Sequence, residues 1–167
     1  ALAEGIQGMF VAEASADAWK IERITGDDKW YDFGSPFHVA EVEGGNRILY
    51  TTWCSMDFPT ELVAVKTDQK GAVVEYTQVT HENDHILSQL DTHETEARYV
   101  RTVDGKDMLT WVLYPPHFDK SKEYPSILIC LGGPQGTLSQ GWSYRWNYRL
   151  MASQGYVVVA PNRRGCP

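Results

Sequence analysis

Near residue 95 the pattern of the sequence changes, and this change limits the folds that the chain can adopt. The residues before it form short stretches rich in β-branched and aromatic side chains, separated by turn residues and without a helical stripe. The residues after it alternate strand-like and helix-like segments. We therefore expect two regions of different architecture, residues 1–95 and residues 96–167.

A weak internal repeat indicates the architecture of the first region. Residues 10–15 (FVAEAS) resemble residues 62–67 (LVAVKT), and residues 19–25 resemble residues 74–80. Repeats of about 50 residues, each made of a few strands, are typical of propeller blades. One whole blade is predicted, with strands at 37–43, 47–55, 61–67 and 73–80. Because a propeller needs about four or more blades to close, we expect residues 1–95 to be the C-terminal blades of a β-propeller completed by the rest of the same polypeptide.

The second region shows the pattern of a parallel sheet covered by helices. A hairpin is predicted around Asp104-Gly105, followed by an apolar strand at 127–131. A helix at about 144–154 follows, with Ser143 as its N-cap and Gly155 as its end, and then a second apolar strand at 156–161. This order predicts the first strands and first helix of an α/β domain, truncated within residues 96–167.

A glycine-rich loop follows the first apolar strand. Gly132 and Gly133 lie where open α/β sheets place their ligands, at the carboxyl end of a strand. Glycine lets the backbone approach a bound atom and point a bare N–H at it. A tight turn without a ligand is the alternative for a Gly-Gly-Pro run considered alone.

Several motifs of the chain resemble the prolyl oligopeptidase family of serine peptidases. They are residues 104–106 (DGK), 111–118 (WVLYPPHF), 132–135 (GGPQ), 144–147 (YRWN) and 155–165 (GYVVVAPNRRG). The resemblance is strong from residue 96 and loose across the blades. It is greatest to the branch of the dipeptidyl-peptidases 5 and acylaminoacyl-peptidases, whose loop usually has a histidine where this chain has Leu131.

The resemblance implies a β-propeller followed by an α/β-hydrolase domain, in a serine exopeptidase of the dipeptidyl- or acylaminoacyl-peptidase type. Its Ser-Asp-His triad would lie beyond Pro167, since the chain has no G-x-S-x-G sequence. One catalytic element is carried over, the backbone N–H of Gly133, which matches the second glycine of the family motif. Gly132 and Arg164 are carried over as substrate-binding positions. An ion pair that fixes its loop is the other explanation of Arg164.

Composition and resemblance together indicate the partners. Fifteen basic against 22 acidic residues give a net charge of −7, which provides no electrostatic footprint for nucleic acid. The apolar runs are too short for a membrane span. We expect short peptide substrates and no cofactor. The resemblance implies a periplasmic or secreted protein and allows a homodimer.

One motif competes with this interpretation. His81, Glu82 and His85 fit the H-E-x-x-H pattern of zinc metallopeptidases, in which two histidines one helical turn apart bind the metal. The run follows a predicted strand and contains Asn83-Asp84, which favour turns, so we expect a turn and no metal site. A non-catalytic binding module of the propeller type is the alternative outside the enzymes.

Overall fold

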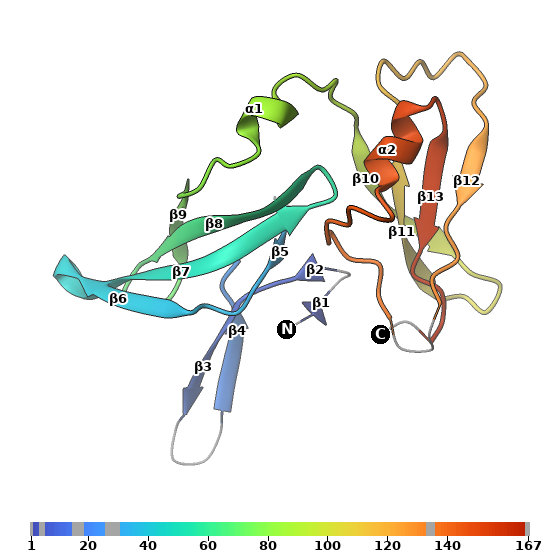
Figure 1. Cartoon of the computed structure of the whole chain (residues 1–167). Coiled ribbons are helices and arrows are strands. Elements are labelled where there is room, and N and C mark those ends of the chain that lie inside the picture. The colour runs from blue at the N-terminus through green and yellow to red at the C-terminus, as the bar shows by residue number, and fades with distance from the viewer. Residues whose placement is uncertain (1, 4–5, 15–18, 26–30, 133–135, 166–167) are drawn as a thin grey trace. The chain divides into compact units, whose positions relative to one another are not determined.

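The computed structural model of the chain describes residues 2–3, 6–14, 19–25, 31–132 and 136–165 (Figure 1). The chain divides into two compact units. Unit 1 contains residues 1–85 and 140–142, and unit 2 contains residues 86–139 and 143–167.

Two antiparallel strand pairs begin unit 1. Strand β1 (Leu2–Ala3) pairs with β2 (Ile6–Gln7), and β3 (Phe10–Ala14) pairs with β4 (Trp19–Arg23). The pair β3–β4 contains the first copy of the repeat that the sequence predicted. Its second copy is the antiparallel pair formed by β8 (Phe58–Thr67) and β9 (Val73–Gln78). The repeat therefore corresponds to two hairpins of the same kind.

The predicted four-stranded blade is confirmed, with small shifts in its boundaries. Its strands are β6 (His38–Val42), β7 (Asn46–Ser55), β8 and β9, and each pairs antiparallel with the next. A short 3₁₀ helix, η1 (Glu43–Gly45), joins β6 to β7. The sequence did not predict β5 (Asp32–Phe33), which pairs with β7 beside β6. The turn between β8 and β9 is held by Asp68, whose carboxylate accepts from the N–H groups of Lys70 and Ala72, both at 2.9 Å.

The core of the blade is an aromatic cluster on one face of β7 and β8. Val63 and Val65 are fully buried two positions apart on β8, as expected for a strand with one face toward a core. Trp53 and Phe33 are also buried, and Tyr76 stacks on Trp53 with ring centroids 6.2 Å apart. Full burial of each such side chain contributes about 1.5–3 kcal/mol, so this cluster holds the blade together.

Unit 2 contains a mixed four-stranded sheet. Its strands are β10 (Thr95–Arg101), β11 (Asp107–Leu113), β12 (Ser126–Leu128) and β13 (Val157–Pro161), in the spatial order β10-β11-β13-β12 (Figure 1). The hairpin β10–β11 is the one that the Asp104-Gly105 turn predicted. Strand β13 runs antiparallel to β11 and parallel to β12. A short helix, α1 (Asp84–Leu87), precedes this sheet in the sequence.

Strand β13 has the central position in the described sheet that its apolar sequence predicted. Val158 and Ala160 of β13 are fully buried between β11 and β12. Strand β12 is shorter than predicted and lies at the edge of the described sheet, where Leu128 is 63% exposed.

Helix α2 (Tyr148–Ser153), which contacts β11 and β13, begins four residues later than predicted. Its N-cap is Asn147, whose side-chain oxygen accepts from the N–H of Leu150 at 2.9 Å, so the prediction of Ser143 was wrong. Ser143 instead accepts from the N–H of Trp146 at 3.0 Å within a separate bend. Gly155 follows the helix with φ of 90°, which confirms the predicted end.

No helix in the described residues is long and apolar enough to cross a bilayer.

Candidate functional site

The parallel pair β12–β13 determines where the glycine-rich loop leaves the sheet. Ile127 pairs with Val158, and the N–H of Ile129 donates to the carbonyl of Val159 at 2.8 Å. Parallel strands point their carboxyl ends the same way, so the residues after Leu128 and those after Pro161 emerge at one edge. This is the edge at which open α/β sheets bind their ligands.

The outgoing limb of the loop contains Leu131 and Gly132. The guanidinium of Arg163 donates to the carbonyl oxygen of Leu131 at 3.0 Å. Gly132 is exposed, and a Cβ placed on it would meet no heavy atom within 4 Å. The space beside its backbone is therefore open to an approaching group. Gly133, the predicted catalytic donor, lies outside the described residues, so its role stays a prediction.

The return limb is attached to the sheet at Leu138, which is buried. The side-chain oxygen of Asn162 accepts from the N–H of Leu138 at 2.7 Å, and the side-chain nitrogen of Asn162 donates to the carbonyl of Leu138 at 3.0 Å. The indole N–H of Trp111, a fully buried residue of β11, donates to the same carbonyl at 2.8 Å. Three hydrogen bonds therefore hold the backbone of one residue.

The two limbs also contact each other. A Cβ added to Gly136 would lie 3.1 Å from Cδ2 of Leu131, which is closer than ordinary van der Waals contact. The side chain of Leu131 therefore packs closely against the backbone of Gly136. The resembled branch usually has a histidine where this chain has Leu131. Leu131 supplies apolar packing, and its carbonyl oxygen accepts from the guanidinium of Arg163.

The sequence left two roles open for Arg164, substrate binding and an ion pair that fixes its loop. The structure shows the ion pair. The guanidinium of Arg164 binds the carboxylate of Asp104, in the turn between β10 and β11. Asp104 in turn accepts from the hydroxyl of Thr102 at 2.5 Å. The pair links this turn to the loop after β13, whereas the predicted contact of Arg164 with substrate stays a prediction.

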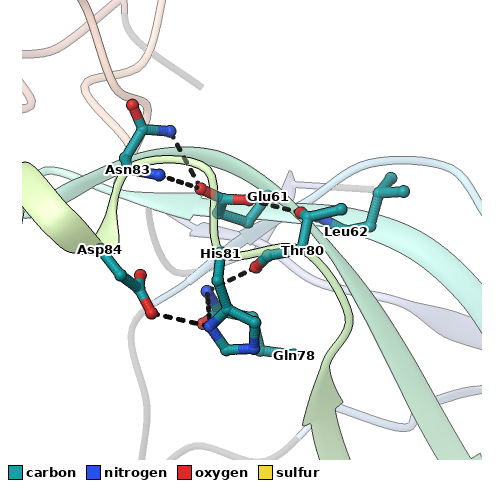
Figure 2. A network of polar contacts seen from close by, with 7 residues as sticks. All are labelled: Glu61, Leu62, Gln78, Thr80, His81, Asn83 and Asp84. Atoms are coloured by element: carbon teal, nitrogen blue, oxygen red, sulfur yellow. Dashed lines mark hydrogen bonds and ion pairs between the residues drawn. The ribbon is translucent and has the colours of Figure 1, made fainter.

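The H-E-x-x-H run does not form the helix that zinc binding by this motif requires. Helix α1 begins at Asp84, so His81 precedes it and His85 is within it. His81 Nδ1 lies 2.7 Å from a carboxylate oxygen of Asp84 (Figure 2). Within the ranges that the structure covers, no cluster of three or more His, Cys, Asp or Glu side chains has the geometry to hold a metal ion.

The segment after β9 is instead organised around a buried carboxylate, that of Glu61 on β8. Figure 2 shows Thr80 and Asn83 directed at this group. The N–H and the side-chain nitrogen of Asn83 donate to it at 3.2 and 2.9 Å, and the Thr80 hydroxyl donates to its other oxygen. Burial alone would raise the pKa of Glu61, but these hydrogen bonds outweigh burial and lower the pKa below its ordinary value. The ionised carboxylate of Glu61 therefore attaches the segment after β9 to strand β8.

Sequence reasoning missed the residues that attach the loop to the sheet, which are Asn162, Arg163 and Trp111. All three lie within motifs that carried the family resemblance. Their hydrogen bonds join residues 24 to 32 positions apart, and no local pattern indicates such pairs. A polar residue directly after a buried strand was the available signal.

Comparisons with known proteins identify the family. No family model matches the chain. The chain is 43% identical over 164 residues to dipeptidyl-peptidase 5 from Porphyromonas gingivalis, an alignment that covers 98% of this chain and 23% of the relative. The chain belongs to the prolyl oligopeptidase family. It spans 23% of that relative's length. Within the family, its sequence is similar to the dipeptidyl-peptidase 5 branch.

Solved structures of the family support the fold. The acylaminoacyl peptidase of Pyrococcus horikoshii matches with a TM-score of 0.61 at 23% identity, covering 86% of this chain and 20% of that one. Oligopeptidase B from Leishmania major matches with a TM-score of 0.64 at 14% identity, covering 98% of this chain and 22% of that one. The predicted fold class is confirmed: blades of a β-propeller followed by the N-terminal part of an α/β-hydrolase domain.

Proposed function

We propose that the protein containing this segment is a serine exopeptidase of the dipeptidyl- or acylaminoacyl-peptidase type. It hydrolyses short peptides through a Ser-Asp-His triad that lies beyond this chain. The observation that carries the proposal is the 43% identity, across 98% of the chain, to a relative named dipeptidyl-peptidase 5. Identity at this level along almost the whole segment favours a shared chemistry as well as a shared fold.

The proposed contribution of this segment is the loop from Leu131 to Leu138. In acyl transfer, a carbonyl oxygen gains negative charge in the transition state, and a fixed N–H stabilises that charge more than it stabilises the substrate. We assign this donor to Gly133. Two described features support the assignment: the loop starts at the carboxyl end of β12, and the space beside Gly132 is open.

Gly132 and Arg164 are the proposed substrate-binding residues. Gly132 presents a bare backbone next to the proposed donor, and this allows a peptide chain to approach closely. The side chain of Arg164 is 73% exposed although it binds Asp104. A guanidinium has five N–H donors, so Arg164 retains donors for a substrate carbonyl or carboxylate.

The two regions have separate proposed roles. Residues 1–95 supply the C-terminal blades of the propeller, and residues 96–167 supply the beginning of the hydrolase domain. We propose that the protein is periplasmic or secreted, which fractionation of the producing cells tests. Sedimentation analysis of the full-length protein tests a homodimer.

A panel of fluorogenic peptides tests the proposed activity on the full-length protein. Dipeptidyl amides with a free N-terminus and N-acetylated aminoacyl amides separate the two exopeptidase types. We expect hydrolysis of at least one class and stoichiometric labelling of one serine beyond this segment by a fluorophosphonate. If the folded protein shows no cleavage of either class and no serine labelling, the proposal is wrong.

A further inference from the structure

Two consecutive residues after β13, Asn162 and Arg163, hold both limbs of the glycine-rich loop. Asn162 binds Leu138 on the return limb, and Arg163 binds Leu131 on the outgoing limb. The described residues between these two attachment points are Gly132 and residues 136–137. The loop is therefore fixed at both ends by one short segment of backbone.

Asn162 is itself fixed to the sheet. Its backbone N–H donates to the carbonyl of Leu109 on β11 at 2.8 Å. Its planar side-chain amide then forms two bonds with the backbone of one residue, one as acceptor and one as donor. An ionised carboxylate could not form this pair of bonds, because it has no donor. A hydroxyl could not form it with two separate atoms, because its one oxygen would have to donate and accept.

The environment strengthens these bonds. Leu138 is 6% exposed, and Trp111, which donates to the same carbonyl, is fully buried. Hydrogen bonds in a medium of low dielectric are stronger, and they orient a backbone more tightly than bonds at an open surface do. The return limb is therefore held more firmly than the outgoing limb, where Arg163 is exposed.

We propose that Asn162 and Arg163 are positioning residues, which hold the two described limbs of the loop in place for the proposed oxyanion donor. This inference rests on the proposed function. Neither residue touches the reacting atoms in this proposal, and both act through the loop backbone. A donor is useful only at 2.7–3.1 Å from the developing oxyanion, so small displacements of the loop lower the rate.

The principal test is Asn162→Ala in the full-length enzyme. We expect kcat to fall roughly 10- to 100-fold, as for a displacement of about 1 Å at an active site, while KM changes less than about twofold. The affinity for a substrate-like peptidyl aldehyde, which forms a charged tetrahedral adduct with the serine, should fall in parallel with kcat. A purely structural role would lower the yield of folded enzyme without this split between kcat and KM.

Asn147→Ala is the matched control. Asn147 also accepts from a backbone N–H of unit 2, but the N–H is that of Leu150, and the bond caps helix α2. We expect kcat, KM and aldehyde affinity to equal those of the parent. A control variant that loses kcat as Asn162→Ala does would overturn the assignment to the loop.

Arg163→Gln provides the second variant if Asn162→Ala does not fold. Arg163 is exposed, so its replacement should leave folding intact, and we expect kcat to fall about 3- to 10-fold at constant KM. If Asn162→Ala folds and keeps the kcat of the parent, the inference is wrong. If Asn162→Ala does not fold, a parent-like kcat in Arg163→Gln overturns the inference instead. Absence of cleavage and of serine labelling in the parent itself would instead overturn the proposed function, and this inference with it.

Discussion

The blade of unit 1 and the sheet of unit 2 differ in how sequence order relates to spatial order. In the blade, β6, β7, β8 and β9 are neighbours in both orders, joined by short turns. In unit 2, β13 lies between β11 and β12, although residues 129–156 separate β12 from β13 in the sequence. The crossover brings two loops to one edge of the sheet, which hairpins between consecutive strands do not do. The second arrangement therefore produces the candidate site.

Both regions use a polar side chain to hold a distant backbone. Glu61 binds Asn83, 22 residues away, and Asn162 binds Leu138, 24 residues away. Glu61 attaches the segment after β9 to the blade, and Asn162 attaches a loop at the ligand-binding edge. We therefore expect the first bond to affect stability and the second to affect the rate.

The largest effect is expected at the proposed donor. Replacing the amide between residues 132 and 133 by an ester, through semisynthesis of the full-length enzyme, removes the N–H of Gly133 with little change in shape. We expect kcat to fall roughly 10²–10³-fold with little change in KM. Steady-state kinetics measure this effect, and fluorophosphonate labelling confirms that the triad still assembles. An ester variant that cleaves peptides at the parent rate would show that Gly133 is only a turn residue.

A large effect on stability is expected at Glu61. Glu61→Ala leaves the Thr80 hydroxyl and the N–H of Asn83 without their acceptor and should cost about 2–3 kcal/mol of unfolding free energy. Denaturant unfolding of the full-length protein measures this loss, with Glu75→Ala on the exposed side of β9 as control. The kcat of the folded fraction should equal that of the parent. A loss of kcat in that fraction would contradict the separation of roles.

The stabilisation by Glu61 should also depend on pH. Because folding lowers the pKa of Glu61, its contribution is complete above the unfolded value of about 4.3 and is lost as pH falls through the folded pKa. The stability difference between the parent and Glu61→Ala should therefore be constant from about pH 8 to 5 and decrease below that range. A difference that increases on acidification would contradict this sign.

A smaller effect is expected at Gly105, in the turn that carries Asp104. Gly105 has φ of 76°, which costs a residue with a Cβ about 1 kcal/mol. An added Cβ would lie 3.6 Å from Arg101, an ordinary contact, so the cost of Gly105→Ala should come from the backbone alone. Denaturant unfolding measures it. A cost above about 3 kcal/mol would indicate that the turn and its ion pair with Arg164 rearrange.

The smallest effect is expected at His81. Its contact with Asp84 is between side chains that are 59% and 55% exposed, and such pairs contribute about 0–1 kcal/mol. His81→Ala should leave stability, activity and metal content close to those of the parent. Metal analysis after dialysis checks this result. One zinc per chain in the parent that disappears in His81→Ala would support the metallopeptidase alternative.

The predictions that succeeded and those that failed depend on different ranges of interaction. The strands of the blade and the hairpin at Asp104-Gly105 follow from alternation and turn residues close in sequence. The start of α2 was wrong because Ser143 and Asn147 are both good caps. Each accepts from the N–H three residues later, but the helix begins only after Asn147. Strand β12 was predicted too long because its apolar sequence does not indicate where its pairing ends.

The sequence alone was sufficient to predict the two-part architecture, the strands of the blade, and the family through its motifs. These depend on local periodicity, turn chemistry and short matched segments. Only the tertiary structure showed that Glu61 binds the segment after β9, and that Asn162, Arg163 and Trp111 hold the glycine-rich loop. The physical reason is that each of these bonds joins groups more than 20 residues apart, and the order of strands in the sheets decides which such groups meet.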